Sequence, residues 1–278
     1  MKAIRPMLSI ITLNELLGIL PNASEHGPLV DHMLEACHWF MLVLFVGWTT
    51  YFFIAICKFH KSRNPKADYH GVRSHASTHI EFSVVLIEAV LLLGFALPLW
   101  GRRVNDIPQT GERHEVRCIA EQFRWFFHYT GPDGKFGRQN TRFLSNANPL
   151  GIDPNDENGK DDFVTINDLH LVNHKPTVVR VGSRDVIHGL ALQQMRIQQD
   201  AMPGMEIPQW FRPIKTGTWD IICAQLCGSG HYQMLAKYTV EEQKDFDAFQ
   251  KDALDLKASN AASAAPAADA KPAAPEPK

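Results

Sequence analysis

Two long apolar runs near the start of the chain constrain its fold most strongly. Residues 37–57 are 21 residues without a Lys, Arg, Asp or Glu, and residues 82–100 are 19 residues with Glu88 as their one charge. About 20 apolar residues cross the hydrocarbon core of a bilayer as a helix. A helix in the core of a soluble protein is usually apolar on one face, whereas these runs are apolar all round. We therefore predict two membrane-spanning helices, at about 37–57 and 80–100.

The charges that flank these runs predict how the helices cross the membrane. Residues 58–78 carry five Lys or Arg and one acid, whereas residues 17–36 carry no Lys or Arg. Positive charge is retained on the cytoplasmic side. We expect an extracytoplasmic segment at 1–32 and a hairpin at 33–101 with a cytoplasmic loop. Whether the first residues are a cleaved signal peptide stays open, since no clear small-residue cleavage site follows their apolar run.

The rest of the chain has a different pattern. Short strand-like segments broken by Gly, Pro, Asn and Asp are typical of a small β-sandwich, which we place at 104–240. The expected strands include residues 122–129, 164–166, 177–181, 217–222 and 235–240. Residues 131–163 are hydrophilic and predict a long surface insertion. An amphipathic helix is expected at 241–256, followed by a disordered Ala/Pro-rich tail at 257–278.

Twelve residues near the end of the sandwich hold four side chains that bind soft metals. They are Cys223, Cys227, His231 and Met234, with two glycines between them that let the loop turn back. Thiolate, imidazole and thioether groups are the ligands that copper prefers. A structural zinc site rarely uses Met, and a disulfide would leave His231 and Met234 in place by chance. We therefore interpret residues 223–234 as a copper loop.

Two cysteines in one loop favour a pair of copper ions over a single-copper blue site, which needs one Cys. Two copper ions bridged by thiolates need one terminal imidazole each, so a second histidine has to come from elsewhere. His188 is the candidate, because it follows the strand-like run at 177–181. The remaining cysteines, Cys37, Cys57 and Cys118, suggest no disulfide framework, and no CxxCH motif for covalent haem is found.

Two further segments of the sequence match a known family together with the copper loop. Together with Asp-Val-Ile-His at 185–188 and Asp-Ala-Met-Pro-Gly at 200–204, it resembles subunit II of the haem–copper cytochrome c oxidases over about residues 33–240. The resemblance implies a two-helix transmembrane hairpin followed by a cupredoxin-like β-sandwich with a dinuclear CuA centre. In this centre the thiolates of Cys223 and Cys227 would bridge the two copper ions, and His188 and His231 would be the terminal imidazoles. The thioether of Met234 and the backbone carbonyl of Gln225 would be the axial ligands.

Two positions depart from the pattern of the family. Its aromatic strand has two tryptophans, and electrons from cytochrome c enter at the first. Phe123 occupies that place here and Trp125 is kept, so Trp125 is the remaining candidate for electron transfer. Most members have Glu at the position of Gln225, and its carboxylate binds magnesium at the boundary with subunit I. A neutral amide is a poorer partner for a hard dication, so magnesium is not assured here.

Two acids lie in or beside the second apolar run, on one face of the expected helix. Glu81 and Glu88 are seven residues apart. An acid inside a membrane span is costly unless it faces protein or water, which makes it a functional candidate. In the resembled family an acid near the cytoplasmic end of this helix marks the mouth of a proton path into subunit I, and Glu81 matches it. Glu88 has no such counterpart, and a protonated carboxyl bonded to a neighbouring helix is an equal alternative.

The resemblance also implies a function. The chain is expected to be the subunit of a proton-pumping terminal oxidase that takes electrons from a c-type haem donor. It would pass them to haem in subunit I, where oxygen becomes water. Because Phe123 stands in place of the tryptophan, we expect either a donor held in a supercomplex or a differently shaped docking face, rather than a generic soluble cytochrome c. The expected location is the bacterial inner membrane, with the copper domain in the periplasm. Alternatives are the CuA subunit of a nitric-oxide reductase and a non-enzymatic, membrane-anchored copper carrier. A formal net charge of −2 excludes a strongly basic nucleic-acid binder.

Overall fold

The structure, a computed structural model, describes residues 13–66, 69–71, 74–146 and 148–264. The chain divides into a helical unit, which ends at Ile107 and includes Gln193–Ile197, and a β-sandwich unit made of the rest. Residues 1–12, with the possible signal peptide, and residues 265–278, with most of the expected tail, lie outside the described residues.

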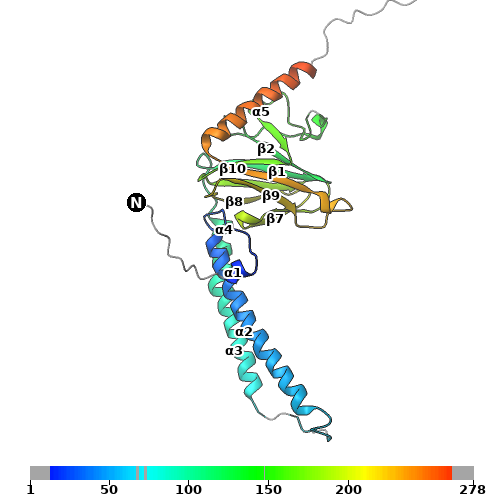
Figure 1. The fold of residues 1–278 in the computed structure, drawn as a ribbon. Coiled ribbons are helices and arrows are strands. Elements are labelled where there is room, and N and C mark those ends of the chain that lie inside the picture. Colours follow the sequence, from blue (N-terminus) through cyan, green and yellow to red (C-terminus); the bar gives the residue numbers. More distant parts are fainter. Residues whose placement is uncertain (1–12, 67–68, 72–73, 147, 265–278) are drawn as a thin grey trace, which may run out of the picture. The chain divides into compact units, whose positions relative to one another are not determined.

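Helices make up most of the helical unit (Figure 1). The described helices are α1 (Leu13–Leu16), α2 (Gly27–Phe59), α3 (Ala76–Val90), the π-helical η1 (Leu91–Ala96) and α4 (Leu97–Asn105). The last three follow one another directly and form one continuous helix. Within it the Leu97 N–H donates to the Leu92 carbonyl, five residues back. Pro98, the next residue, has no N–H to continue the regular ladder, and the wider turn lies directly before it.

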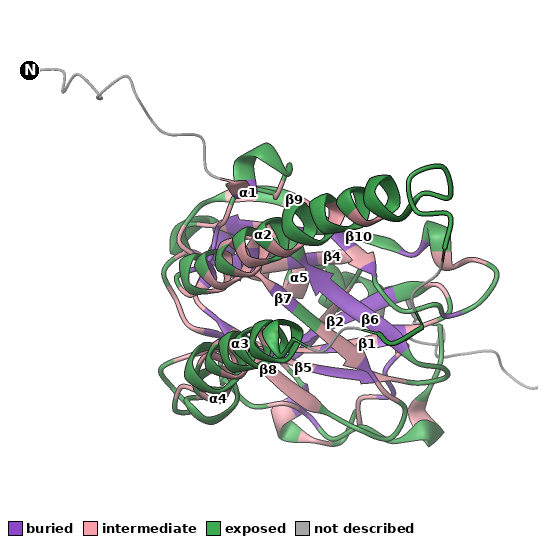
Figure 2. Cartoon of the chain, turned by 90° about the horizontal axis from the view of Figure 1, so that it is seen from below, coloured by how far each residue is buried: buried purple, intermediate pink, exposed green. Residues whose placement is uncertain are grey.

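These two long helices contain both predicted spans and extend beyond them. Gly27–Phe59 and Ala76–Asn105 are long and apolar enough to cross a membrane, and no residue in the apolar window of either is buried. Figure 2 shows both helices mostly in the colour of exposed residues. Large apolar side chains turned outward all round a helix are suited to lipid or to another membrane subunit, because water would not solvate them. Both helices are therefore candidate membrane spans.

The described strands of the other unit form two five-stranded sheets, a β-sandwich of the expected cupredoxin-like kind. One sheet has the order β3-β2-β1-β5-β8 and the other β4-β10-β9-β6-β7. Both sheets are mixed, because β1 and β5 are parallel, as are β4 and β10. The strands are β1 (His114–Glu121), β2 (Arg124–Tyr129), β3 (Phe163–Ile166), β4 (Asp168–Val172), β5 (Thr177–Ser183), β6 (His188–Leu192), β7 (Ile197–Ala201), β8 (Ile207–Phe211), β9 (Gly217–Cys223) and β10 (Leu235–Glu241).

The core lies between the two sheets. In β1 every second residue from Val116 through Cys118 to Ala120 is buried, as the period of two in a strand requires. The residues of β6 are all buried, which Figure 2 shows as an unbroken purple strand. β6 carries His188 as its first residue, so this histidine starts from a rigid, enclosed position.

The C-terminal helix packs its aromatic side chains on the sandwich. In α5 (Gln243–Ala264) the Phe249 ring stacks on His170, with centroids 3.7 Å apart. The helix was expected to end at residue 256 and to be followed by a disordered tail, but it continues to Ala264. Alanine-rich sequence favours helix, and the Lys257 ammonium donates to three carbonyls in the segment 159–162. These contacts stabilise the turns around residue 257.

The insertion at 131–163 is more than the surface loop that its composition predicted. It contains η2 (Thr141–Phe143) and η3 (Glu157–Gly159), and part of it is buried. Asp162 and His128 of β2 are both fully buried and lie 2.6 Å apart, carboxylate to imidazole. The same carboxylate accepts the N–H of Gly137 at 2.8 Å. A hydrophilic sequence cannot reveal this docking, because the partner of the acid lies on another strand.

Candidate metal centre

Strand pairing brings the two halves of the candidate site together. β6 pairs antiparallel with β9, with Leu190 opposite Cys223, so the start of β6 lies beside the loop that follows β9. Two backbone hydrogen bonds fix this position. The Ala224 N–H donates to the Gly189 carbonyl at 2.8 Å, and the Cys223 N–H donates to the Met234 carbonyl at 3.3 Å.

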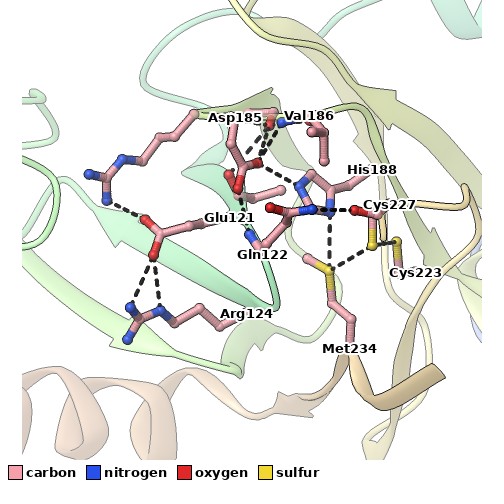
Figure 3. A network of polar contacts seen from close by, with 12 residues as sticks. Glu121, Gln122, Arg124, Asp185, Val186, His188, Cys223, Cys227 and Met234 are labelled. Atoms are coloured by element: carbon pink, nitrogen blue, oxygen red, sulfur yellow. Dashed lines mark hydrogen bonds and ion pairs between the residues drawn. The ribbon is translucent and has the colours of Figure 1, made fainter. Parts of the chain in front are cut away.

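Four predicted ligand side chains meet at this point (Figure 3). Cys223 Sγ lies 3.7 Å from Cys227 Sγ, and Met234 Sδ lies 3.7 Å from Cys227 Sγ. Met234 Sδ also lies 3.1 Å from His188 Nδ1, and all four residues are buried. The ligand atoms of His188, Cys223 and Cys227 lie within 4.8 Å of one another, so they could hold a metal ion. The sequence prediction that His188 joins the loop is thus supported by its position.

The other two predicted ligands lie at the edge of the same site. His231 Nδ1 lies 3.5 Å from Cys227 Sγ, and its ring is half-buried. The backbone carbonyl of Gln225 lies 3.2 Å from Cys223 Sγ, whereas the Gln225 side chain is exposed. The structure therefore brings all six predicted ligand groups to one place, and their metal ligation stays a prediction.

The two sulfur atoms suit a metal better than a disulfide. Both cysteines are free, and their separation of 3.7 Å is far longer than an S–S bond of about 2.05 Å. A metal ion binds thiolate sulfur at about 2.3 Å, so one ion can contact both sulfur atoms at this separation. Burial and the neighbouring Cys223 thiol raise the pKa of the Cys227 thiol to about 11. At neutral pH Cys227 keeps its proton until a metal ion displaces it.

Asp185 and Gln122 contact this group of ligands, and the sequence did not single out either as a residue that positions a ligand. Asp185 Oδ1 lies 2.9 Å from His188 Nε2, so it orients the ring with Nδ1 toward the sulfur atoms. Partial burial opposes ionisation of Asp185, but hydrogen bonds from His188 and from the N–H groups of Gln122 and Val186 hold its pKa below the usual range. The spacing of an Asp three residues before the His was a visible signal for this contact. No pattern in the sequence around Gln122 indicated that its N–H would bind Asp185.

The aromatic side chains of β2 and the turn before it take different positions. Trp125 is fully buried, with its ring centroid 6.1 Å from that of His188. A buried ring cannot contact a docked protein, so any role of Trp125 in electron transfer is internal. Phe123 is half-buried and lies against the metal loop, because a Cβ on Gly230 would come within 2.6 Å of its ring. Glu81 and Glu88 lie exposed on α3, in the helical unit, and their predicted roles are not tested by these contacts.

Comparison with known proteins agrees with the geometry. The family model for the periplasmic domain of cytochrome c oxidase subunit II matches residues 115–242. An alternative cytochrome c oxidase subunit 2 from Bradyrhizobium diazoefficiens is 33% identical over 82% of this chain and 81% of its own length. A cytochrome c oxidase subunit 2 from Cereibacter sphaeroides is 25% identical over 84% of this chain and 81% of its own length.

Solved structures include the periplasmic domain of cytochrome oxidase subunit II from Bradyrhizobium japonicum. It is 26% identical, with a TM-score of 0.40, over 54% of this chain and 98% of that one. The sequence relationship to the Bradyrhizobium diazoefficiens protein covers most of both chains, from the helical unit into the sandwich. The chain therefore belongs to the cytochrome c oxidase subunit II family.

Proposed function

We propose that this chain is the subunit at which electrons enter a proton-pumping haem–copper terminal oxidase. It would take electrons from a c-type haem donor and pass them to haem in subunit I, where oxygen is reduced to water. The observation that carries the proposal is the position of His188, whose Nδ1 lies 3.1 Å from Met234 Sδ, beside both loop cysteines. The pairing of β6 with β9 brings this histidine, 35 residues before Cys223, to the loop cysteines, which supports a shared metal site.

The donor set fits a dinuclear copper centre of the CuA type. Two copper ions would be held by all six predicted ligand groups, namely two thiolates, two imidazoles, a thioether and a backbone carbonyl. A single tetrahedral zinc ion would use four of them and leave the thioether without a role. The six groups belong to Cys223, Cys227, His188, His231, Met234 and the carbonyl of Gln225. A copper pair held in this way would supply one-electron transfer without bond chemistry.

The protein contributes rigidity and exclusion of water. His188 and Cys223 belong to paired strands, and Met234 directly precedes β10, so these ligands cannot move far on a change of charge. The sulfur atoms and the His188 ring are buried, which keeps water out of the space between them. Little reorganisation is then needed when one electron arrives or leaves. This is the property that an electron-transfer site requires.

Membrane location belongs to the same proposal. The two candidate spans would cross the bacterial inner membrane, with residues 58–78 in the cytoplasm and the sandwich in the periplasm. Subunit I and other oxidase subunits would cover parts of the exposed apolar helices. Glu81, near the start of α3, would lie at the cytoplasmic side, where a proton path into subunit I can begin.

The donor would differ from an ordinary soluble cytochrome c. Phe123 replaces the usual tryptophan and lies over the loop, and the one tryptophan kept in this strand, Trp125, is buried. We expect a haem donor held in a supercomplex, or one that binds a differently shaped docking face. Stopped-flow reduction of the assembled oxidase by soluble cytochrome c should be slow compared with reduction by the membrane-bound donor. Equal rates would count against this part of the proposal.

The test of the metal centre is the electron paramagnetic resonance spectrum of the full chain, purified in detergent and loaded with copper. Hyperfine splitting from one electron shared by two equivalent copper nuclei is expected. A single-copper spectrum would overturn the proposal. A copper carrier has to release its metal, so loss of copper to a mild chelator would favour that alternative. A nitric-oxide reductase would be recognised by nitric-oxide reduction in the purified complex.

A further inference from the structure

Gln122, in the turn between β1 and β2, contacts both halves of the metal centre. Its side-chain amide donates to the Cys227 carbonyl at 2.6 Å. Its backbone N–H donates to Asp185 Oδ2 at 2.8 Å, and Asp185 Oδ1 lies 2.9 Å from His188 Nε2. Figure 3 shows these contacts as one chain of dashed lines from Cys227 to His188. One residue therefore joins the loop cysteine to the distant histidine.

The loop depends on this contact on its Cys227 side. Near Cys223 the backbone is fixed to Gly189 and to Met234. In the stretch from 225 to 233, the Cys227 carbonyl accepts a hydrogen bond from outside the loop, and its donor is Gln122. Gly228 lies in this stretch with φ of +138°, a conformation that other residues rarely adopt. A glycine-containing loop is intrinsically free to move, so a single strong contact has a large effect.

The turn that carries Gln122 is itself held firmly. Glu121, the residue before it, forms ion pairs with Arg184 at 2.7 Å and with Arg124 at 3.0 Å. Phe123, the residue after it, lies over the loop, since a Cβ on Gly228 would come within 3.2 Å of its ring and 2.7 Å of the Gln122 amide. Gln122 thus reaches the loop from a fixed base in the other sheet.

We infer that Gln122 is a positioning residue of the metal centre, one that sets the separation between the Cys227 half and the His188 half. The inference rests on the proposed copper site, because its effect is on groups that would bind copper. Without the amide contact the Cys227 carbonyl is free to turn, and Cys227 Sγ moves relative to Met234 Sδ and His188. Contacts of this kind typically change metal affinity by about 10- to 100-fold.

Two variants separate hydrogen bonding from charge. Gln122→Glu keeps the shape of the side chain but replaces the N–H donor by an ionised acceptor, and Gln122→Leu removes the donor without adding charge. Gln198→Glu and Gln198→Leu are matched controls, because Gln198 is exposed on β7 and its side chain makes none of the described hydrogen bonds. Each full-length variant is purified in detergent, and its copper affinity is measured by competition with a chelator.

Both Gln122 variants are expected to lose about 10- to 100-fold in copper affinity and to show unequal hyperfine splitting from the two copper nuclei. The Gln198 variants should retain the affinity and the spectrum of the unchanged chain. Loss with Gln122→Glu alone would assign the effect to charge and overturn the inference. Wild-type affinity and spectrum in Gln122→Leu would overturn it as well. A single-copper spectrum in the unchanged chain would instead refute the proposed function, so the two failures are distinguishable.

Discussion

Replacing Gly189 by alanine should damage the proposed metal centre without changing any of its predicted ligands. A Cβ at this position would lie 2.8 Å from the Gln225 nitrogen and 3.0 Å from the Ala224 carbonyl carbon. These are backbone atoms, which cannot rotate away as a side chain does. Ordinary contact begins near 3.4 Å, so the loop would have to move by about 0.6 Å. Metal–ligand distances tolerate changes of only about 0.2 Å.

Two magnitudes follow for Gly189→Ala. Forcing an extra carbon into a filled space costs about 1–3 kcal/mol, which for a chain of this size lowers the melting temperature by about 2–12 °C. The displaced loop also stretches the bond from the Ala224 N–H to the Gly189 carbonyl, which is 2.8 Å long in the structure. Copper affinity should therefore fall at least about tenfold, as for changes beside other metal ligands.

The assay compares thermal unfolding and chelator competition in the full chain. Gly137→Ala is the matched control, because its Cβ would come within 2.5 Å of Gly159 Cα, in the insertion and away from the ligands. Gly137→Ala should lower the melting temperature to a similar degree and leave copper affinity unchanged. If Gly189→Ala kept wild-type copper affinity and spectrum, the reasoning that the loop is tightly seated on β6 would be refuted.

Three further predictions concern acid, a buried hydrogen bond between a carboxylate and an imidazole, and the metal itself. Burial lowers the pKa of His114 to about 3, so below pH 6.5 the unfolded chain binds more protons than the folded chain. Acidification from pH 7 to 4.5 should then lower the free energy of unfolding by about 2–3 kcal/mol, as measured by denaturant titration. If the His114→Phe variant lost as much over the same pH range, His114 would not be the cause. Asp162→Ala removes the acceptor for the buried His128 imidazole and the Gly137 N–H. It should therefore lower the free energy of unfolding by about 3 kcal/mol and make the insertion sensitive to protease. A variant as resistant to protease as the wild type would argue against the docked insertion. Removing copper with a strong chelator should lower the melting temperature, because copper present at 100 times its dissociation constant stabilises the folded chain by about 2.7 kcal/mol. The melting temperature of Cys223→Ser should not change when the chelator is added.

The sequence by itself determined the features that depend on neighbouring residues. The two apolar runs predicted the long helices, since length and lack of charge need no tertiary information. The strand segments of the sandwich followed from short apolar patterns bounded by turn residues, and each overlaps an observed strand. The ligand side chains from Cys223 to Met234 lie within one loop, so their proximity was also readable. His188 was predicted as a ligand because two copper ions would need a second imidazole besides His231, and the structure places it beside the loop.

Tertiary structure alone decided the features that depend on strand register and on contacts between sheets. The approach of Gly189 to the loop, the bond from Gln122 to Cys227 and the burial of Trp125 all join segments far apart in the chain. The docked insertion and the long α5 belong to the same class, since their partners lie on other elements. Local preference sets which element forms, but the pairing of β6 with β9 sets which side chains meet. That pairing turns a list of possible ligands into one site.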